Sequence, residues 1–140
     1  MVLTLTKERA LAEFLDVEEN EVKENSWGTY GTGNGNEYMV LTDDEADEEV
    51  YKEIENSLWA FNAEFIIEMT GLNSGVESLR TMQKNSCEDC NDFIKAIIDG
   101  TCGMECFVES AIESDGRGHF ISYYDGEENE QGEYFIYRIN

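Results

Sequence analysis

The strongest constraint on the fold of this chain is a stripe of apolar residues behind a helix-start signal. Thr42 is followed three residues later by Glu45, the spacing of a capping box. The apolar residues that follow recur at spacings of three or four: Val50, Ile54, Leu58, Phe61 and Phe65. We expect one helix from Asp43 to Met69, ending at Gly71. At about 27 residues, roughly 40 Å, it is long for a domain of this size, so a break near Phe61-Asn62 is the alternative.

Shorter helices and strands are predicted around this element. Thr6 is a candidate N-cap for a helix over residues 7–14. Further helices are predicted over residues 74–83, 87–98 and 102–113. Predicted strands are the segments 17–27 and 37–42, joined by a glycine-rich loop, and 119–124 and 133–139, which form a hairpin around an acidic loop at 125–132.

This order of elements predicts an α+β fold. We expect residues 1–140 to form a single acidic domain, because no internal repeat or low-complexity linker divides the chain. In this fold a long central helix and shorter helices pack on a small antiparallel sheet that includes a C-terminal β-hairpin.

The charge balance excludes several classes of partner. The chain has 140 residues, with 32 Asp and Glu against 9 Lys and Arg, a formal net charge of −23. Direct binding to nucleic acid and anchoring on an anionic membrane both need a cationic face, which so few bases cannot build. No apolar run approaches the roughly 20 residues of a membrane span, and the first residues do not resemble a signal peptide. We therefore expect a cytoplasmic protein.

The acid does not predict a disordered chain. Leu, Ile, Val and Phe together number 32 residues, about 23% of the sequence, above the roughly 20% typical of disorder.

The carboxylates are clustered along the sequence. Eight lie within thirteen residues of the long predicted helix: Asp43, Asp44, Glu45, Asp47, Glu48, Glu49, Glu53 and Glu55. Acids in a first helical turn are favoured by the helix dipole, but pairs such as Asp43/Asp47 and Asp44/Glu48 should repel. A further cluster lies in the C-terminal acidic loop: Asp125, Glu127, Glu128 and Glu130. Either these acids only keep the protein soluble, or they form a surface that docks on a basic groove of another protein.

Four cysteines are the candidate metal ligands. Cys87 and Cys90 form a Cys-x2-Cys pair, and Cys102 and Cys106 form a Cys-x3-Cys pair. Four thiols within twenty residues could bind zinc tetrahedrally. We favour structural thiols over zinc, since both pairs lie in predicted helices and free cysteine is often buried as a small hydrophobe. Disulfides are less expected, because nothing in the sequence indicates export.

Catalytic signatures are weak throughout. His119 is the single histidine, and we expect it in a turn leading into a strand, with Arg117 pairing locally to an acid. The glycines at 31, 33 and 35 lack the spacing of a phosphate-binding loop, and Arg138 occupies the position where an EF-hand needs an acid. The sequence therefore predicts no enzyme, no catalytic residue and no cofactor.

Three segments carry a resemblance to known sequences: Tyr38-Met-Val-Leu-Thr-Asp-Asp-Glu-Ala-Asp47, Ser57-Leu-Trp-Ala-Phe-Asn62 and the stretch from Asp115 to Glu128. They resemble small acidic proteins encoded by bacteriophages and prophages, a group with no activity to carry over. The resemblance implies a phage origin and residence in a bacterial host cell. In composition the chain is similar to DNA-mimic proteins of the antirestriction and anti-CRISPR type.

Two hypotheses follow. The first is a phage-encoded acidic binding protein that inhibits a host nucleic-acid-binding defence protein by occupying its basic DNA- or RNA-binding groove. The alternative is a structural or regulatory phage protein that acts through another protein interface, with the acid serving solubility only. Both predict a protein partner rather than nucleic acid or membrane.

Overall fold

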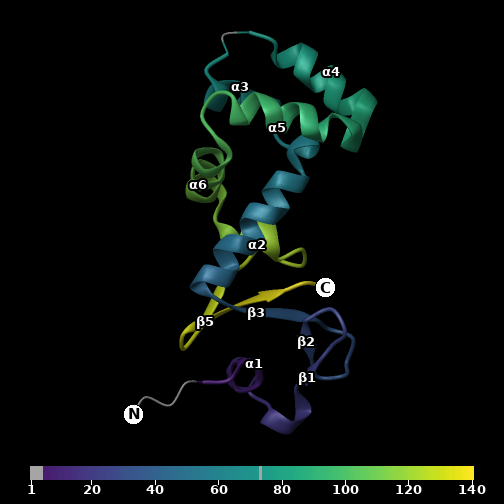
Figure 1. The fold of residues 1–140 in the computed structure, drawn as a ribbon. Helices are drawn as coiled ribbons and strands as arrows, with labels where there is room; N and C mark the ends of the chain where they lie inside the picture. The colour runs from purple at the N-terminus through teal and green to yellow at the C-terminus, as the bar shows by residue number, and fades with distance from the viewer. Residues whose placement is uncertain (1–4, 73) are drawn as a thin grey trace. The chain divides into compact units, whose positions relative to one another are not determined.

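The computed structural model describes residues 5–72 and 74–140, and the fold is α+β, as the sequence predicts (Figure 1). The described chain forms two compact units. The first comprises the described residues up to Val50 together with Asp115–Asn140, and the second comprises Tyr51–Ser114. No helix in the described part of the chain is long and apolar enough to cross a membrane.

An antiparallel sheet forms the centre of the first unit. Its strands among the described residues are β1 (Lys23–Glu24), β2 (Tyr30–Gly31), β3 (Tyr38–Thr42), β4 (Asn129–Gln131) and β5 (Tyr134–Arg138), in the spatial order β1-β2-β3-β5-β4. β3 and β5 are neighbours in the sheet (Figure 1) and are paired along their full lengths. Val40 lies opposite Ile136 in this register. The sheet therefore joins the first and last parts of the sequence.

Helix α1 (Lys7–Leu15) covers this sheet, and its predicted cap is confirmed. The Thr6 hydroxyl accepts a hydrogen bond from the backbone N–H of Arg9 at 3.1 Å. Ala10 and Leu11 are fully buried and belong to the same apolar core as Val40 and Ile136. This core holds the sheet in place, and α2 (Asp43–Asn56) and Glu128, which contribute to the candidate site, adjoin its strands β3 and β4 in the sequence.

The predicted strand over 119–124 is wrong. These residues belong to a short helix, α7 (Arg117–Ile121), and the segment that follows it. The C-terminal hairpin is confirmed, but it is formed by β4 and β5, with Gly132 in the left-handed region at φ 62° in the turn. The β-propensity of residues 119–124 is overridden because Gly118 is buried against the backbone of residues 126–128.

The predicted long helix is interrupted. It forms α2 (Asp43–Asn56), the 3₁₀ turn η2 (Leu58–Ala60) and α3 (Ala63–Thr70), which ends at Gly71 as expected. The alternative break at Phe61-Asn62 is confirmed, because the Asn62 side chain caps α3 by accepting from the N–H of Phe65 at 3.0 Å. The apolar stripe is buried at Val50, Ile54 and Leu58.

The second unit is helical. After α3 come α4 (Val76–Ser86), the 3₁₀ turn η3 (Cys87–Cys90), α5 (Asn91–Asp99) and α6 (Met104–Asp115). Asn91 holds the interrupted segment in place: its amide donates to the carbonyl of Glu55 at 2.7 Å and accepts from the N–H of Trp59 at 3.1 Å. Phe61, Phe65 and Phe107 pack with ring centroids 5.2–5.8 Å apart.

The close approach at Gly118 gives a direct test of the α7 geometry. A Cβ at this position would lie 2.5–2.8 Å from backbone atoms of Gly126, Glu127 and Glu128. We expect Gly118→Ala to reduce the free energy of unfolding by about 1–3 kcal/mol, measured by urea denaturation followed by circular dichroism. Gly100→Ala is the control, because its Cβ would make only an ordinary 3.4 Å contact. Equal stability of the two variants would contradict this packing.

Candidate acidic docking surface

The first turn of α2 is built by the predicted capping box. The backbone N–H of Thr42 donates to the Glu45 carboxylate at 2.9 Å, and the N–H of Glu45 donates to the Thr42 hydroxyl at 3.2 Å. Lys7 from α1 lies 2.8 Å from the same carboxylate. The hydrogen bonds from Lys7 and Thr42 hold the pKa of Glu45 below its usual value. Glu45 therefore fixes the start of α2.

Arg117 connects α2 to the C-terminal part of the first unit. Its Nη1 donates to Asp43 Oδ1 at 2.8 Å and to Asp47 Oδ1 at 3.0 Å, and its Nε donates to Glu128 Oε1 at 2.7 Å. We call Asp43, Asp47 and Glu128 the anchored cluster. Because these acids come from two distant segments of the chain, Arg117 ties both segments to α7.

The guanidinium of Arg117 is itself held between aromatic residues and acids. Its Cζ lies 4.6 Å from the centre of the Phe135 ring, and the Tyr137 hydroxyl donates a hydrogen bond to Glu128. Burial opposes the charge of Arg117, but its bonds to Glu128 and Asp43 outweigh this effect and raise its pKa. Burial and the bond to Glu128 also raise the pKa of Tyr137, so both donors stay protonated.

The anchored cluster remains open to solvent although the arginine does not. Only 11% of the Arg117 side chain is exposed, whereas 68% of Asp43, 61% of Asp47 and 31% of Glu128 are exposed. Three carboxylates against one guanidinium leave two negative charges on the surface. Arg117 therefore holds these carboxylates from the buried side, and their other atoms remain accessible to solvent.

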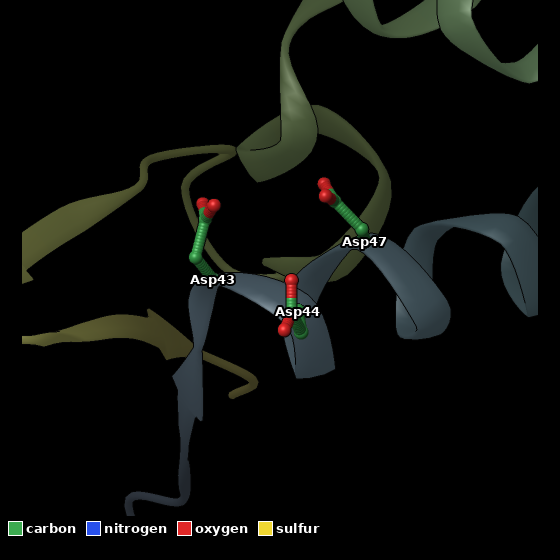
Figure 2. Close-up of side chains that lie close together, drawn as sticks. All are labelled: Asp43, Asp44 and Asp47. Atoms are coloured by element: carbon green, nitrogen blue, oxygen red, sulfur yellow. The ribbon is translucent and has the colours of Figure 1, made fainter.

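The expected repulsion between Asp43 and Asp47 is therefore relieved, contrary to the sequence argument. Figure 2 shows these two carboxylates on the same side of α2, with Asp44 between them along the helix. Arg117 bridges them because a base from α7, about seventy residues away, folds against the first turn. Asp44 and Glu48, one turn apart, are both exposed and add further charge to this end of the helix.

The other acids predicted on α2 differ in exposure. Glu49, Glu53 and Glu55 are half-buried, and Glu55 lies 3.9 Å from Lys95. Glu53 and Glu55 belong to the second unit, whereas the predicted acids up to Glu49 belong to the first. The structure thus concentrates the exposed carboxylates of α2 in its first two turns.

The C-terminal acids divide into two groups. Asp125 accepts hydrogen bonds from the Ser122 hydroxyl at 2.8 Å and from the N–H of Glu127 at 3.0 Å, and these bonds lower its pKa. Asp125 therefore shapes the turn after α7. Glu127 and Glu130 are exposed, and Glu128 joins the anchored cluster. Only Glu128 of this group is tied to acids of α2 by Arg117.

Three carboxylates lie close enough together to suggest a cation site. Oxygens of Asp43, Asp44 and Asp47 lie within 4.8 Å of one another. Two of these acids already accept hydrogen bonds from Arg117, so a positive charge is in place among them. Exposed acids of this kind are common without a metal ion, and the group is better described as a guanidinium-bound acidic cluster.

The four cysteines are not gathered into a metal site in this structure. Cys87 and Cys106 are exposed, Cys102 is half-buried and Cys90 is buried. Among the described residues, which include all four thiols, no three of these sulfurs lie within 4.8 Å of one another. Cys90 donates to the carbonyl of Cys87 at 3.1 Å, and burial raises its pKa. Cys90 therefore fits a structural thiol, whereas Cys87 and Cys106 are exposed.

His119 lies on α7, not in the turn that the sequence predicts. It is exposed, and its ring meets Phe120 edge-on with centroids 4.9 Å apart. The sequence predicts that Arg117 pairs with a nearby acid, and Glu128 is such a partner. The bonds from Arg117 to the distant acids of α2 were not predicted. One feature of the sequence indicated these bonds: Arg117 is the one Lys or Arg between Lys95 and Arg138, in a chain with many acids to pair with it.

Comparison with protein families, curated proteins and solved structures gives no match for this chain. The case for its function therefore depends on the site geometry.

The pKa of Glu45 predicts how the first turn of α2 responds to acid. A carboxyl whose pKa is lowered on folding stabilises the fold above its ordinary value, about 4.3, and loses this contribution as the pH falls through its folded pKa. We expect a double-mutant cycle of Glu45→Gln and Lys7→Gln to give a coupling free energy of about 0.5–1 kcal/mol at pH 7. Urea denaturation at pH 7 and again below about pH 4.3 should show this coupling shrinking as the pH falls and Glu45 becomes protonated.

The cycle removes the effect of the many other acids, because their titration contributes equally to all four proteins. A coupling of the same size at both pH values would show that the charge of Glu45 does not hold α1 against α2.

Proposed function

We propose that this chain is a phage-encoded acidic binding protein that inhibits a host nucleic-acid-binding defence protein, of the CRISPR or restriction type. It binds by placing exposed carboxylates in the basic groove that otherwise holds DNA or RNA. The observation that carries the proposal is the anchored cluster, whose acids are held by a largely buried arginine while staying exposed.

Fixed carboxylates suit this role better than mobile ones. A side chain that is ordered before binding loses less conformational entropy when a partner docks, so more of its interaction energy contributes to affinity. Arg117 orders Asp43, Asp47 and Glu128, and the capping box orders the helix that presents Asp44 and Glu48. The surface can therefore meet arginines and lysines of a groove without rearranging.

The density of charge also supports competition with a phosphate backbone. Duplex DNA carries one negative charge per about 1.7 Å of its axis, and acids on successive helical turns approximate such a row. Oxygens of Asp43, Asp44 and Asp47 lie within 4.8 Å of one another, and Arg117 compensates only one of these three charges. A net charge of −23 adds long-range attraction for a basic partner, which favours fast and salt-sensitive association.

The experiment reverses exposed charges that do not hold the fold together. Asp44→Lys with Glu48→Lys changes two exposed acids one turn apart on α2. The partner is recovered from a bacterial lysate on the immobilised chain, eluted at about 0.5 M salt and tested for release by duplex DNA. We expect the double variant to bind the purified partner at least about tenfold more weakly and to stop competing with DNA.

Glu105→Lys with Glu109→Lys is the matched control. These two acids are also exposed and one turn apart, but on α6, so the change in net charge is identical. If both double variants lose affinity equally, only total charge matters and the located surface is wrong. If the α2 variant keeps its partner, or if no partner is released by salt and DNA, the alternative of an interface protein whose acid serves solubility is favoured.

A further inference from the structure

An apolar pocket lies within the second unit, between α3, α4 and α5. Its volume is about 210 Å³, and its walls include Ile67, Leu72, Ser78, Met82, Phe93 and Ile97. None of these residues is charged. The pocket is open to solvent, since Phe93 is 58% exposed and Leu72 is 44% exposed.

Phe93 and Leu72 are exposed together at this pocket. Large apolar groups that remain exposed together around a hollow commonly mark a binding site, because covering them releases water from apolar surface. Their positions are also supported by the fold. Phe93 lies on the same helix as Asn91, whose side chain binds Glu55 and Trp59, so α5 is held rigidly behind the pocket.

The size of the pocket favours a side chain over a separate small molecule. Sites for drug-sized ligands usually measure about 300–1,000 Å³, larger than this pocket. A cavity of about 150 Å³ lined by aliphatic and aromatic residues is enough to hold benzene, so one Phe-, Leu- or Met-sized side chain fits here. Protein interfaces commonly gain much of their affinity from one such anchor in a pocket.

The negative charge of the second unit favours one kind of protein segment over others as the occupant of the pocket. It carries twelve Asp and Glu against four Lys and Arg. Glu68 and Asp92 are exposed next to the lining residues Ile67 and Phe93, while Arg80 is engaged by Glu64 and Glu77. A second copy of this chain would bring another −23 charges to this surface, whereas a basic segment would be attracted.

We propose that this pocket receives an apolar side chain from a basic segment of a protein partner. The inference rests on the proposed function, because it assigns the pocket to the same class of basic partner. It adds a second kind of contact: the carboxylates provide attraction that salt weakens, and the pocket provides apolar burial that salt does not weaken.

The test uses three synthetic peptides of equal length. The first places Leu and Phe at helical spacing among lysines, the second replaces those apolar residues with alanine, and the third replaces the lysines of the first with glutamate. Binding is followed by the ¹³C-methyl NMR signal of Met82, which lines the pocket, with Met39 on β3 as an internal reference. We expect the first peptide to shift the Met82 signal and to bind at least about tenfold more tightly than the other two.

Phe93→Asp should abolish this preference, reducing the affinity for the first peptide to that for the alanine peptide. Trp27→Asp is the matched control, because Trp27 is 89% exposed in the first unit and the change in charge is the same. Ser78→Phe provides a second variant that fills the pocket from an exposed position and leaves the buried core unchanged.

The outcomes separate the two proposals. Equal binding of the lysine peptides with and without apolar residues would overturn the pocket assignment and leave the acidic surface standing. Equal binding of the first and third peptides would show that the pocket does not select a basic segment, against the proposed function as well. A dimer in analytical ultracentrifugation that Phe93→Asp dissociates would assign the pocket to a second copy and overturn the proposal.

Discussion

One buried guanidinium organises the candidate surface of this protein. Arg117 binds Asp43 and Asp47 on α2 and Glu128 before β4, and it packs on Phe135 of β5. Removing one partner from such a network leaves the remaining charges uncompensated, which is why the start of α2 and the segment after α7 depend on each other. Gly118, next to Arg117, lets α7 approach the backbone of residues 126–128 closely enough for these bonds to form.

The bonds of Arg117 explain part of the excess of acidic residues on α2. The sequence alone predicts that acids one turn apart in the first turns of α2 repel each other and destabilise the helix. In the structure, part of that acid serves the fold, because Glu45 completes the capping box and Asp43 and Asp47 hold Arg117. Asp44 and Glu48 are exposed on the same two turns, so they are the acids most available to a partner. Of the eight acids on α2 that the docking hypothesis names, those in the first two turns of the helix are therefore the best candidates for contact with a partner.

Local signals in the sequence predicted local structure well. The caps at Thr6 and Thr42 and the stop at Gly71 are confirmed because each depends on residues within four positions. The single helix to Met69 and the strand over 119–124 were wrong because residues far away in the sequence determine the conformation there. Asn91 holds the interruption between α2 and α3 from over thirty positions away, and Arg117 reaches α2 from more than seventy. Neither the helical conformation of residues 117–121 nor the pocket beside Phe93 has a signal in the periodicity of the chain, because both depend on tertiary packing.

We expect the carboxylates that bind Arg117 to immobilise its guanidinium. The most direct measurement is ¹⁵N NMR of the arginine side chains at neutral pH, comparing Arg117 with Arg9, whose side chain is 63% exposed. We expect separate, slowly exchanging Nη–H signals for Arg117, because its bonds to Asp43, Asp47 and Glu128 hinder rotation of the guanidinium. A single averaged signal for Arg117, like that expected for Arg9, would show that these carboxylates do not hold the guanidinium in place.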